Sequence, residues 1–363
     1  MRATHLLRTL RQPLAHWRLA ALLALGGVVV ASASCSKVAS LELAVPGTEQ
    51  PANFPAMVYN LAKNPPSAAA FELGKALFYD KRLSHDGTVS CGSCHQVAAA
   101  FAQPGFRFSP GVGGRPGARN APALQNLRWR RSFMADGGVL GLELQALAPL
   151  TDAHEMSMPL ADALARLNAD TNYQQHFAAV YGPGKIDTPQ FLRALAQFTA
   201  SLTSANSRYD KYVRHEAGGE FTAQEVSGLA VFKAKCGGCH ATDLFTDESF
   251  RNNGLDRTFA RDSGRAHITS WPTDRGRFRV PSLRNVAATG PYMHDGRFAT
   301  LAQVLAHYNH GVQPSATLDP LLRQPDGQLG ITLTAQEQAG LLTFLNTLTD
   351  QAFLTDNRLG PPH

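Results

Sequence analysis

Apolar residues recur at helical spacing along most of the chain, and several of these runs follow a Ser, Thr or Asp that can cap a first turn. Sustained alternation of apolar and polar residues, which would indicate strands, is scarce. Long loops rich in Gly and Pro separate the helical runs. The pattern therefore predicts a mainly α fold, with helices over 160–168, 189–202, 222–235, 301–308 and 334–348.

The amino terminus has the pattern of an export signal. Four arginines and no acidic residue lie before residue 36, and an apolar stretch from Leu19 to Ala33 ends in small residues. This stretch is shorter than the roughly 20 residues that a membrane-spanning helix needs. We therefore expect residues 1–35 to be a signal peptide and the mature protein to lie in the periplasm.

Two processing sites compete at the end of this signal. Residues 31–33 fit an ordinary signal peptidase, whereas residues 32–35 resemble a lipoprotein box that ends at Cys35. Cys35 is the only one of the five cysteines outside a closely spaced pair, and a free thiol is a liability in an oxidising compartment. The cysteine count therefore favours a lipidated Cys35, which would tether the protein to a membrane such as the outer membrane.

The charge of the chain argues against a nucleic-acid partner. The formal net charge is +6, but the predicted signal contributes four of these charges. The remaining chain carries about +2, which is too little for a basic binding surface.

The other four cysteines lie in two C-x-x-C-H strings, Cys91-Gly92-Ser93-Cys94-His95 and Cys236-Gly237-Gly238-Cys239-His240. This is the spacing of a c-type haem site, because two thiols bond to the two vinyl groups of one porphyrin and the adjacent imidazole binds the iron. A disulfide between cysteines this close would be strained, and a zinc site would need further ligands nearby. The strings therefore predict two covalent haem c groups, with His95 and His240 as iron ligands.

The chain also repeats itself outside these strings. Segments 122–126 (PALQN) and 133–137 (FMADG) return, at a constant offset, as 281–285 (PSLRN) and 292–296 (YMHDG). Such a repeat indicates duplication of a cytochrome c-like module. We therefore expect an N-terminal haem domain over 53–215 and a C-terminal haem domain over 216–355, with their haems near one another.

The motifs LSHDGTVSCGSCH, GARNAPAL, FRVPSLRNV and GPYMHDGRFATL resemble those of bacterial dihaem cytochrome c peroxidases and their relatives of the methylamine-utilisation maturation (MauG-like) type. The similarity runs from about residue 71 to 349, nearly the whole mature chain. The resemblance implies that the N-terminal haem reacts with peroxide. It also implies that the C-terminal haem takes electrons from a donor and passes them on.

The same resemblance assigns two residues to the peroxide side of the first haem. Glu155 would move a proton between the two peroxide oxygens, and Gln145 would orient the peroxide by hydrogen bonding. His154, beside Glu155, is a second candidate for moving protons. A solvated loop position without a catalytic role is the alternative for both loop residues.

The coordination of the two irons differs between members of this family. Reductively activated members block the first haem with a second His, and Val112 stands at that position here. Because valine cannot bind iron, we expect an open, five-coordinate first haem.

The distal ligand of the second haem is Met in most peroxidases of the family and Tyr in the MauG-like relatives, and the matching residue here is Tyr308. A tyrosinate lowers the reduction potential, whereas Met raises it. Met293, His307 and His310 are competing ligands, and a core position is the alternative for the Tyr308 ring.

Two further positions bear on the resemblance. Many relatives place a Trp between the haems as an electron relay, but the matching residue is Ala135, and Trp129 could replace it only by a different route. The family also binds calcium between its domains, at positions matched by Asn120, Thr289 and Pro291. Oxygen donors of this kind suit a hard cation. A capping Asn beside a rigid turn is the alternative.

These expectations lead to a periplasmic dihaem peroxidase that reduces hydrogen peroxide to water with electrons from a small cytochrome c or similar donor. Two alternatives remain: a MauG-like oxidase that modifies a partner protein, and a non-enzymatic electron-transfer cytochrome. Because relatives are often dimers, a homodimer is a further hypothesis.

Overall fold

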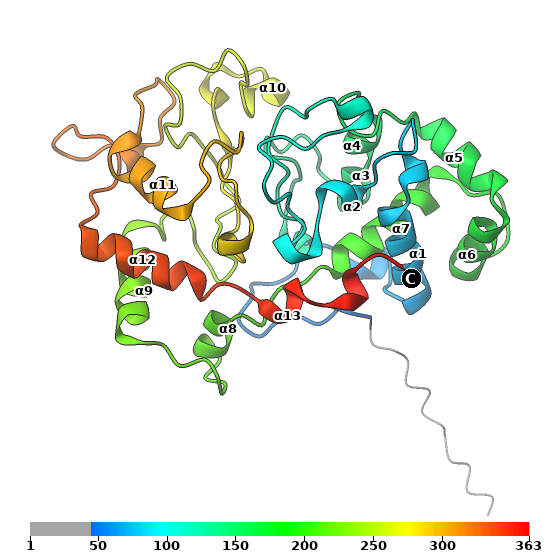
Figure 1. Ribbon diagram of the computed structural model, residues 1–363, viewed down its shortest axis with the longest axis horizontal. Helices are drawn as coiled ribbons and strands as arrows, with labels where there is room; N and C mark the ends of the chain where they lie inside the picture. Colours follow the sequence, from blue (N-terminus) through cyan, green and yellow to red (C-terminus); the bar gives the residue numbers. More distant parts are fainter. Residues whose placement is uncertain (1–44, 363) are drawn as a thin grey trace, which may run out of the picture. The chain divides into compact units, whose positions relative to one another are not determined.

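The computed structural model describes residues 45–362, and these residues are mainly helical, as predicted (Figure 1). The predicted signal peptide and Cys35 lie outside the described residues. The helices are α1 (Ala68–Tyr79), α2 (Cys91–Cys94), α3 (Leu142–Gln145), α4 (Leu147–Thr151), α5 (Leu160–Ala169), α6 (Thr171–Tyr181), α7 (Thr188–Ser201), α8 (Arg208–Val213), α9 (Ala223–Lys235), α10 (Ala266–Thr269), α11 (Leu301–Ala306), α12 (Ala335–Asn346) and α13 (Gln351–Leu354).

The five helices predicted from apolar spacing are confirmed as α5, α7, α9, α11 and α12. Their starts follow the expected caps: the side chains of Thr222, Thr300 and Thr334 each accept a hydrogen bond from the backbone of the first turn. The prediction for 301–308 is wrong at its end. There α11 stops at Ala306, and residues His307–Gly311 form one wide π-helical turn, η8.

Two closely packed helix pairs, α1 with α7 and α9 with α12, organise the fold. Each crossing requires a glycine. A Cβ atom on Gly74 would overlap the carbonyl oxygen of Ala194, and one on Gly228 would overlap that of Gly340. Bare backbone thus lets the helices approach, and Phe198 or Phe344 packs beside the contact.

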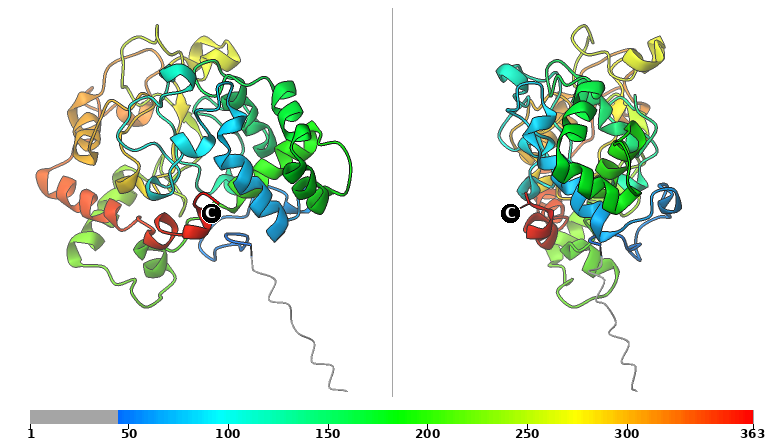
Figure 2. Two further views of the ribbon diagram at one scale, coloured as in Figure 1. Left: turned by 45° about the vertical axis from the view of Figure 1, so that its right-hand side comes forward. Right: turned by 90° about the vertical axis from the view of Figure 1, so that its right-hand side faces the viewer.

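The buried apolar residues form two main clusters. The first spans residues 71–202, and the second spans residues 209–348. The C-terminal segment, drawn in red in Figure 2, returns to the first cluster: Phe353 packs on Phe101 with ring centroids 5.9 Å apart, and Tyr79 donates to the carbonyl of Leu359 at 2.7 Å. The predicted domain limits of 53–215 and 216–355 remain predictions.

One short strand pair escaped the sequence pattern. Strand β1 (Phe250–Arg251) pairs antiparallel with β2 (Phe278–Arg279), so that Phe250 lies opposite Arg279. Two residues are too few to produce a visible alternation. Among residues 45–362, no helix has the length and apolar character needed to cross a membrane.

Candidate active site

The first C-x-x-C-H string forms the one-turn helix α2, which begins after the N-cap Ser90. Ser90 and Ser93 cap each other, with the Ser90 backbone N–H donating to the Ser93 hydroxyl at 3.0 Å. A helical turn places Cys91 and Cys94 on one face, three residues apart. Both thiols are unpaired, as attachment of a haem requires.

The two ligand histidines are held in the same way. The Nδ1 atom of His95 lies 2.6 Å from the carbonyl oxygen of Phe101, and that of His240 lies 3.0 Å from the carbonyl of Phe245. Both phenylalanines have a positive φ, near 60° and 55°. Since Nδ1 is engaged, Nε2 remains to bind an iron, which is the usual arrangement of a ligating histidine.

The electrostatics of both imidazoles also suit an iron ligand. Burial lowers the pKa of His95 and of His240, because a charged imidazolium is poorly solvated there. A neutral ring is the form that coordinates metal. Two thiols and a neutral, oriented imidazole in each string therefore fit a c-type haem.

Glu155 lies on the loop after α4, in the surroundings of the first string. Burial is the main cause that raises the pKa of Cys91 and of Cys94, and the charge of the nearby Glu155 carboxylate adds to both shifts. Part of the Glu155 side chain is exposed to solvent, but the protein around the carboxylate reduces its hydration. Burial, and secondarily the charge of Asp152, raises its pKa to about 7.

A neighbouring loop fixes the backbone of Glu155. The N–H of Val112 donates to the Glu155 carbonyl at 2.8 Å, and Gly111 approaches the His154 carbonyl so closely that a Cβ would overlap it. Val112 is buried, at 5% exposure. The position that carries a blocking His in some relatives therefore holds an apolar side chain directly beside the Glu155 backbone.

Gln145 and His154 occupy different surroundings. Gln145 is the last residue of α3 and is half-buried. Neither its amide nor the Glu155 carboxylate donates or accepts a hydrogen bond with another side chain or backbone group in residues 45–362, so both groups are free to engage a small ligand. His154 is exposed, and its Nδ1 lies 3.2 Å from the carbonyl of Pro116.

The second string follows α9, and Tyr308 lies near it. Burial, and secondarily the charges of Cys239 and Cys236, raises the pKa of the Tyr308 hydroxyl to about 12. Met293, with φ of 74°, is the second candidate ligand. Its sulfur accepts a hydrogen bond from Asn253 Nδ2 at 3.3 Å.

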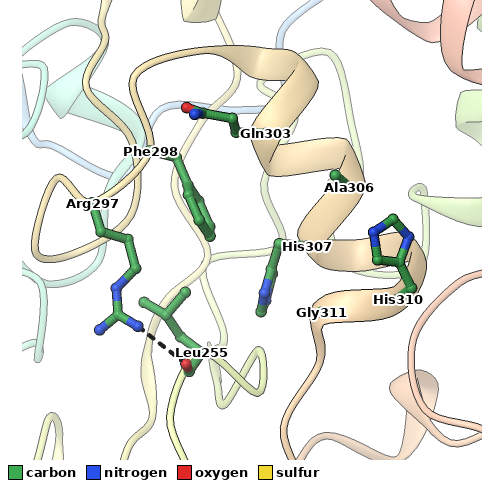
Figure 3. Close-up of a pocket in the computed structure, with 8 residues that line it drawn as sticks. All are labelled: Leu255, Arg297, Phe298, Gln303, Ala306, His307, His310 and Gly311. Carbon is green, nitrogen blue, oxygen red and sulfur yellow. Dashed lines mark hydrogen bonds between the residues drawn. The ribbon is translucent and has the colours of Figure 1, made fainter.

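The other two candidate ligands, His307 and His310, line a surface pocket with Leu255, Arg297 and Phe298 (Figure 3). The Nε2 atom of His307 lies 3.0 Å from the carbonyl oxygen of Asn253, and His310 is exposed. Of the four candidates, Met293 and His307 thus contact Asn253 directly, through the Met293 sulfur and the His307 Nε2 atom.

Ala135, at the position of the relay tryptophan, lies beside residues from distant parts of the chain. The carbonyl of Ala135 accepts from the backbone N–H of Arg279 at 2.8 Å. The ring of Phe250 lies against Gly137, so closely that a Cβ there would overlap it. The Arg265 guanidinium lies 3.9 Å from the Phe250 ring centroid and also approaches Gly137. No sequence signal pointed to Phe250.

Trp129 occupies a separate buried cluster with Phe54 and Leu244. Its ring meets that of Phe54 edge-on at 5.0 Å, and its Nε1 donates to the carbonyl of Pro55 at 2.9 Å. Leu244 belongs to the loop that follows the second haem string. An electron that passed through Trp129 would therefore reach this side chain from the loop after the second haem string.

The expected calcium ligands lie in turns. The Asn120 amide nitrogen donates to the carbonyls of Phe106 and Arg107, at 3.1 and 3.2 Å, and the Asn120 backbone donates to His294 at 2.8 Å. The Thr289 hydroxyl donates to the carbonyl of Val286 at 3.3 Å. Within residues 45–362, no cluster of three or more His, Cys, Asp or Glu side chains forms a metal site. Calcium remains a prediction.

Comparison with known proteins identifies relatives over most of the chain. Residues 68–218 match the model of a family described as di-haem cytochrome c peroxidase. The methylamine utilization protein MauG of Methylorubrum extorquens is 34% identical over 288 residues, which cover 78% of this chain and 79% of that protein. The cytochrome c551 peroxidase of Nitrosomonas europaea is 31% identical over 248 residues, covering 67% and 74%.

A solved structure agrees in fold. The crystal structure of a MauG-like protein associated with microbial copper homeostasis superposes with a TM-score of 0.78 and 35% sequence identity. The match covers 87% of this chain and 99% of that one.

Proposed function

The chain belongs to the family of dihaem cytochrome c peroxidases and MauG proteins, and from this premise we propose that its N-terminal haem site reduces hydrogen peroxide to water. The protein is an oxidoreductase with haem c cofactors. One haem would be held by Cys91, Cys94 and His95, and the other by Cys236, Cys239 and His240. When bound, the haems supply the electrons that convert one peroxide and two protons to two waters.

Glu155 carries the proposal. Its carboxylate accepts a proton from one peroxide oxygen and returns it to the other, so that the second oxygen leaves as water. A pKa raised to about 7 suits a group that must both accept and donate at neutral pH. Gln145, whose amide is free, holds the peroxide by a hydrogen bond. Val112 offers no atom that could occupy the iron in place of peroxide.

The test mixes the ferric holoprotein with hydrogen peroxide, with and without a reduced small cytochrome c. Oxidation of the cytochrome that depends on peroxide is the expected result. If the cytochrome stays reduced at every peroxide concentration, the peroxidase proposal is wrong.

A second candidate function is oxidation of side chains in a partner protein, as a MauG-like oxidase. Tyr308 favours it, because Tyr at this position is typical of that branch, and the relatives include proteins named MauG. Peroxide would then change the spectrum of the ferric protein without oxidising the small cytochrome. The peroxidase instead returns to the ferric state as the cytochrome is consumed.

An electron-transfer cytochrome without enzymatic activity is the third candidate. It would need both irons six-coordinate, so the resting ferric protein would lack a high-spin haem. An EPR spectrum reports the coordination of both irons at once. A high-spin signal from one haem supports the open first site, and its absence contradicts it.

We also propose that the two halves arose by internal duplication. Matched residues have matched conformations: Asn126 and Asn285 both have a positive φ, near 58° and 56°, and each begins a 3-10 turn. The bridge between Phe133 and Val139 recurs at the same offset between 292 and 298. Gln125 also donates to the carbonyl of its own counterpart, Arg284, as expected for equivalent residues near a pseudo-twofold axis.

Calcium and assembly are proposed on the resemblance, and the location on the signal-like amino terminus. A calcium ion would use Asn120, Thr289 and Pro291, with waters completing the shell. Elemental analysis of the purified holoprotein tests it, since a content below one ion per chain contradicts the site. The protein would lie in the periplasm, tethered through Cys35, with a small cytochrome as donor and with a second copy as a dimer partner.

A further inference from the structure

The segment 252–254 is clamped against the loop 312–319. Asn252 is buried, at 1% exposure, and its side-chain nitrogen donates to the hydroxyls of Ser315 and Thr317 at 2.9 and 2.8 Å. Its oxygen accepts from the N–H of Gly254 at 2.9 Å. Gly254, with φ of 69°, lies so close to Val312 that a Cβ would be 2.5 Å from a methyl carbon. The backbone on both sides of Asn253 is therefore fixed.

Asn253, in the middle of this segment, contacts two residues of the second haem site. Its carbonyl oxygen lies 3.0 Å from His307 Nε2, which fixes the first residue of the π turn η8. Its side-chain Nδ2 donates to the sulfur of Met293 at 3.3 Å. One clamped residue thus holds the Met293 sulfur with its amide and, with its carbonyl, the His307 ring that directly precedes Tyr308.

The contact with Met293 has a consequence for metal binding. A thioether sulfur is a weak acceptor, so an N–H bound to it draws on the lone pairs that would otherwise bind iron. The clamp also keeps the Met293 sulfur at the amide.

We propose that Asn253 is a positioning residue that selects Tyr308 over Met293 as the distal ligand of the second haem. It does so by retaining the Met293 sulfur and by fixing His307 at the start of the turn that carries Tyr308. The proposal rests on the dihaem function above, because it concerns the second of the two haems. It does not depend on how the first haem treats peroxide.

The test compares variants of the holoprotein by ferric absorption and EPR spectra and by the reduction potential of each haem. In Asn253→Ala, Met293 is released and competes for the iron, so we expect a methionine-ligated species and a higher potential of the second haem. Asn253→Asp has the same shape but lacks the N–H donors when ionised. It is expected to show the same change, which guards against a folding defect in the alanine variant.

Two controls define the mechanism. Adding Met293→Leu to Asn253→Ala should abolish the new species and return the potential to the parental value or below it. Asn309→Ala removes a neighbouring amide on the same π turn, which bonds to the backbone of Leu333 at 3.2 and 3.0 Å, and should leave the second haem unchanged.

The possible outcomes distinguish failure of this proposal from failure of the proposed peroxidase function. Parental spectra and potentials in both Asn253→Ala and Asn253→Asp would overturn the proposal. A change that persists after Met293→Leu would also overturn it, because the new ligand would then not be Met293. If the parent failed to react with peroxide, the peroxidase function would be lost while the ligand-exchange result would stand.

Discussion

The surroundings of Glu155, on the loop after α4, decide its ionisation. Burial, and then the charge of Asp152, raises its pKa to about 7. Because the carboxylate must be ionised to accept the peroxide proton, the reaction should be slow below this pKa and should rise as the pH increases through it. We expect the rate constant for ferric protein with peroxide to level off above pH 7. Stopped-flow absorbance at a series of pH values measures it, and a rate that falls across this range would contradict the assignment.

Glu155→Gln tests the same carboxylate by substitution. The amide keeps the shape but cannot accept the proton, so the rate with peroxide should fall by about 10²- to 10⁴-fold. The pH dependence near 7 should vanish with it. Glu72→Gln is the matched control, because Glu72 lies on α1 with 59% of its side chain exposed and bonds only to Lys75. Equal rates in the two variants would exclude a role for Glu155.

At the scale of elements, the crossing of α9 and α12 depends on bare backbone at Gly228. In Gly228→Ala, the new methyl would overlap the carbonyl of Gly340, which belongs to a helix backbone and cannot rotate away. We expect the free energy of unfolding to fall by about 1–3 kcal/mol. This occurs although Ala is intrinsically better than Gly in a helix by about 1 kcal/mol. Denaturant unfolding of the holoprotein followed by circular dichroism measures the change.

Gly340→Ala provides the comparison. A methyl there would lie 3.3 Å from the Gly228 Cα, a tight contact without overlap. The loss of stability should therefore be smaller than for Gly228→Ala. A gain in stability at both positions would show that helix propensity, and not the crossing, governs the effect.

Local sequence determines some of the helices and turns more fully than others. Helices α9 and α12 are predicted well, because capping and apolar spacing are properties of neighbouring residues. The π turn at His307–Gly311 is not, since the contact that fixes His307 comes from Asn253, far away in sequence. The same holds for Phe250, whose place beside Gly137 depends on how two distant segments meet.

The residues of the candidate site also differ in how far local sequence predicts them. The haem strings and their histidines are predicted by spacing alone, since the chemistry itself requires that spacing. Glu155 and Tyr308 were reached by matching positions to a family, and their surroundings appear only in the structure. Asn253 carried no signal beyond a turn-forming Asn-Asn-Gly sequence, because its role depends on the partners that surround it.

At the scale of the whole molecule, a buried ion pair connects segments that are distant in sequence. Arg284, in the second P-x-L-x-N segment, bonds to Asp210 of α8 at 2.7 and 2.8 Å, with side-chain exposures of 1% and 0%. Asn53, near the start of the described chain, donates to the same carboxylate at 2.9 Å. Asp210→Asn would leave the guanidinium buried without a counter-charge. We expect the free energy of unfolding to fall by about 3–5 kcal/mol, measured by denaturant unfolding.

Glu216→Gln is the control for this variant, because Glu216 also pairs with one arginine, Arg214, but 48% of its side chain is exposed. An exposed pair contributes about 0–1 kcal/mol, so this variant should be nearly as stable as the parent. Equal stability of both variants would contradict the importance of the buried pair.

The ion pair also predicts how acid acts on the protein. Burial alone would raise the pKa of Asp210, but the hydrogen bonds and charge of Arg284 outweigh it and lower that pKa below its usual value. A carboxylate whose pKa is lower in the folded state stabilises that state fully above its unfolded pKa of about 4. The stabilisation is lost as the pH falls through the lowered folded value. The stability difference between the parent and Asp210→Asn should therefore be constant near neutral pH and should shrink below about pH 4. A difference that stayed constant in acid would mean that Asp210 contributes through shape and hydrogen bonding, and not through its charge.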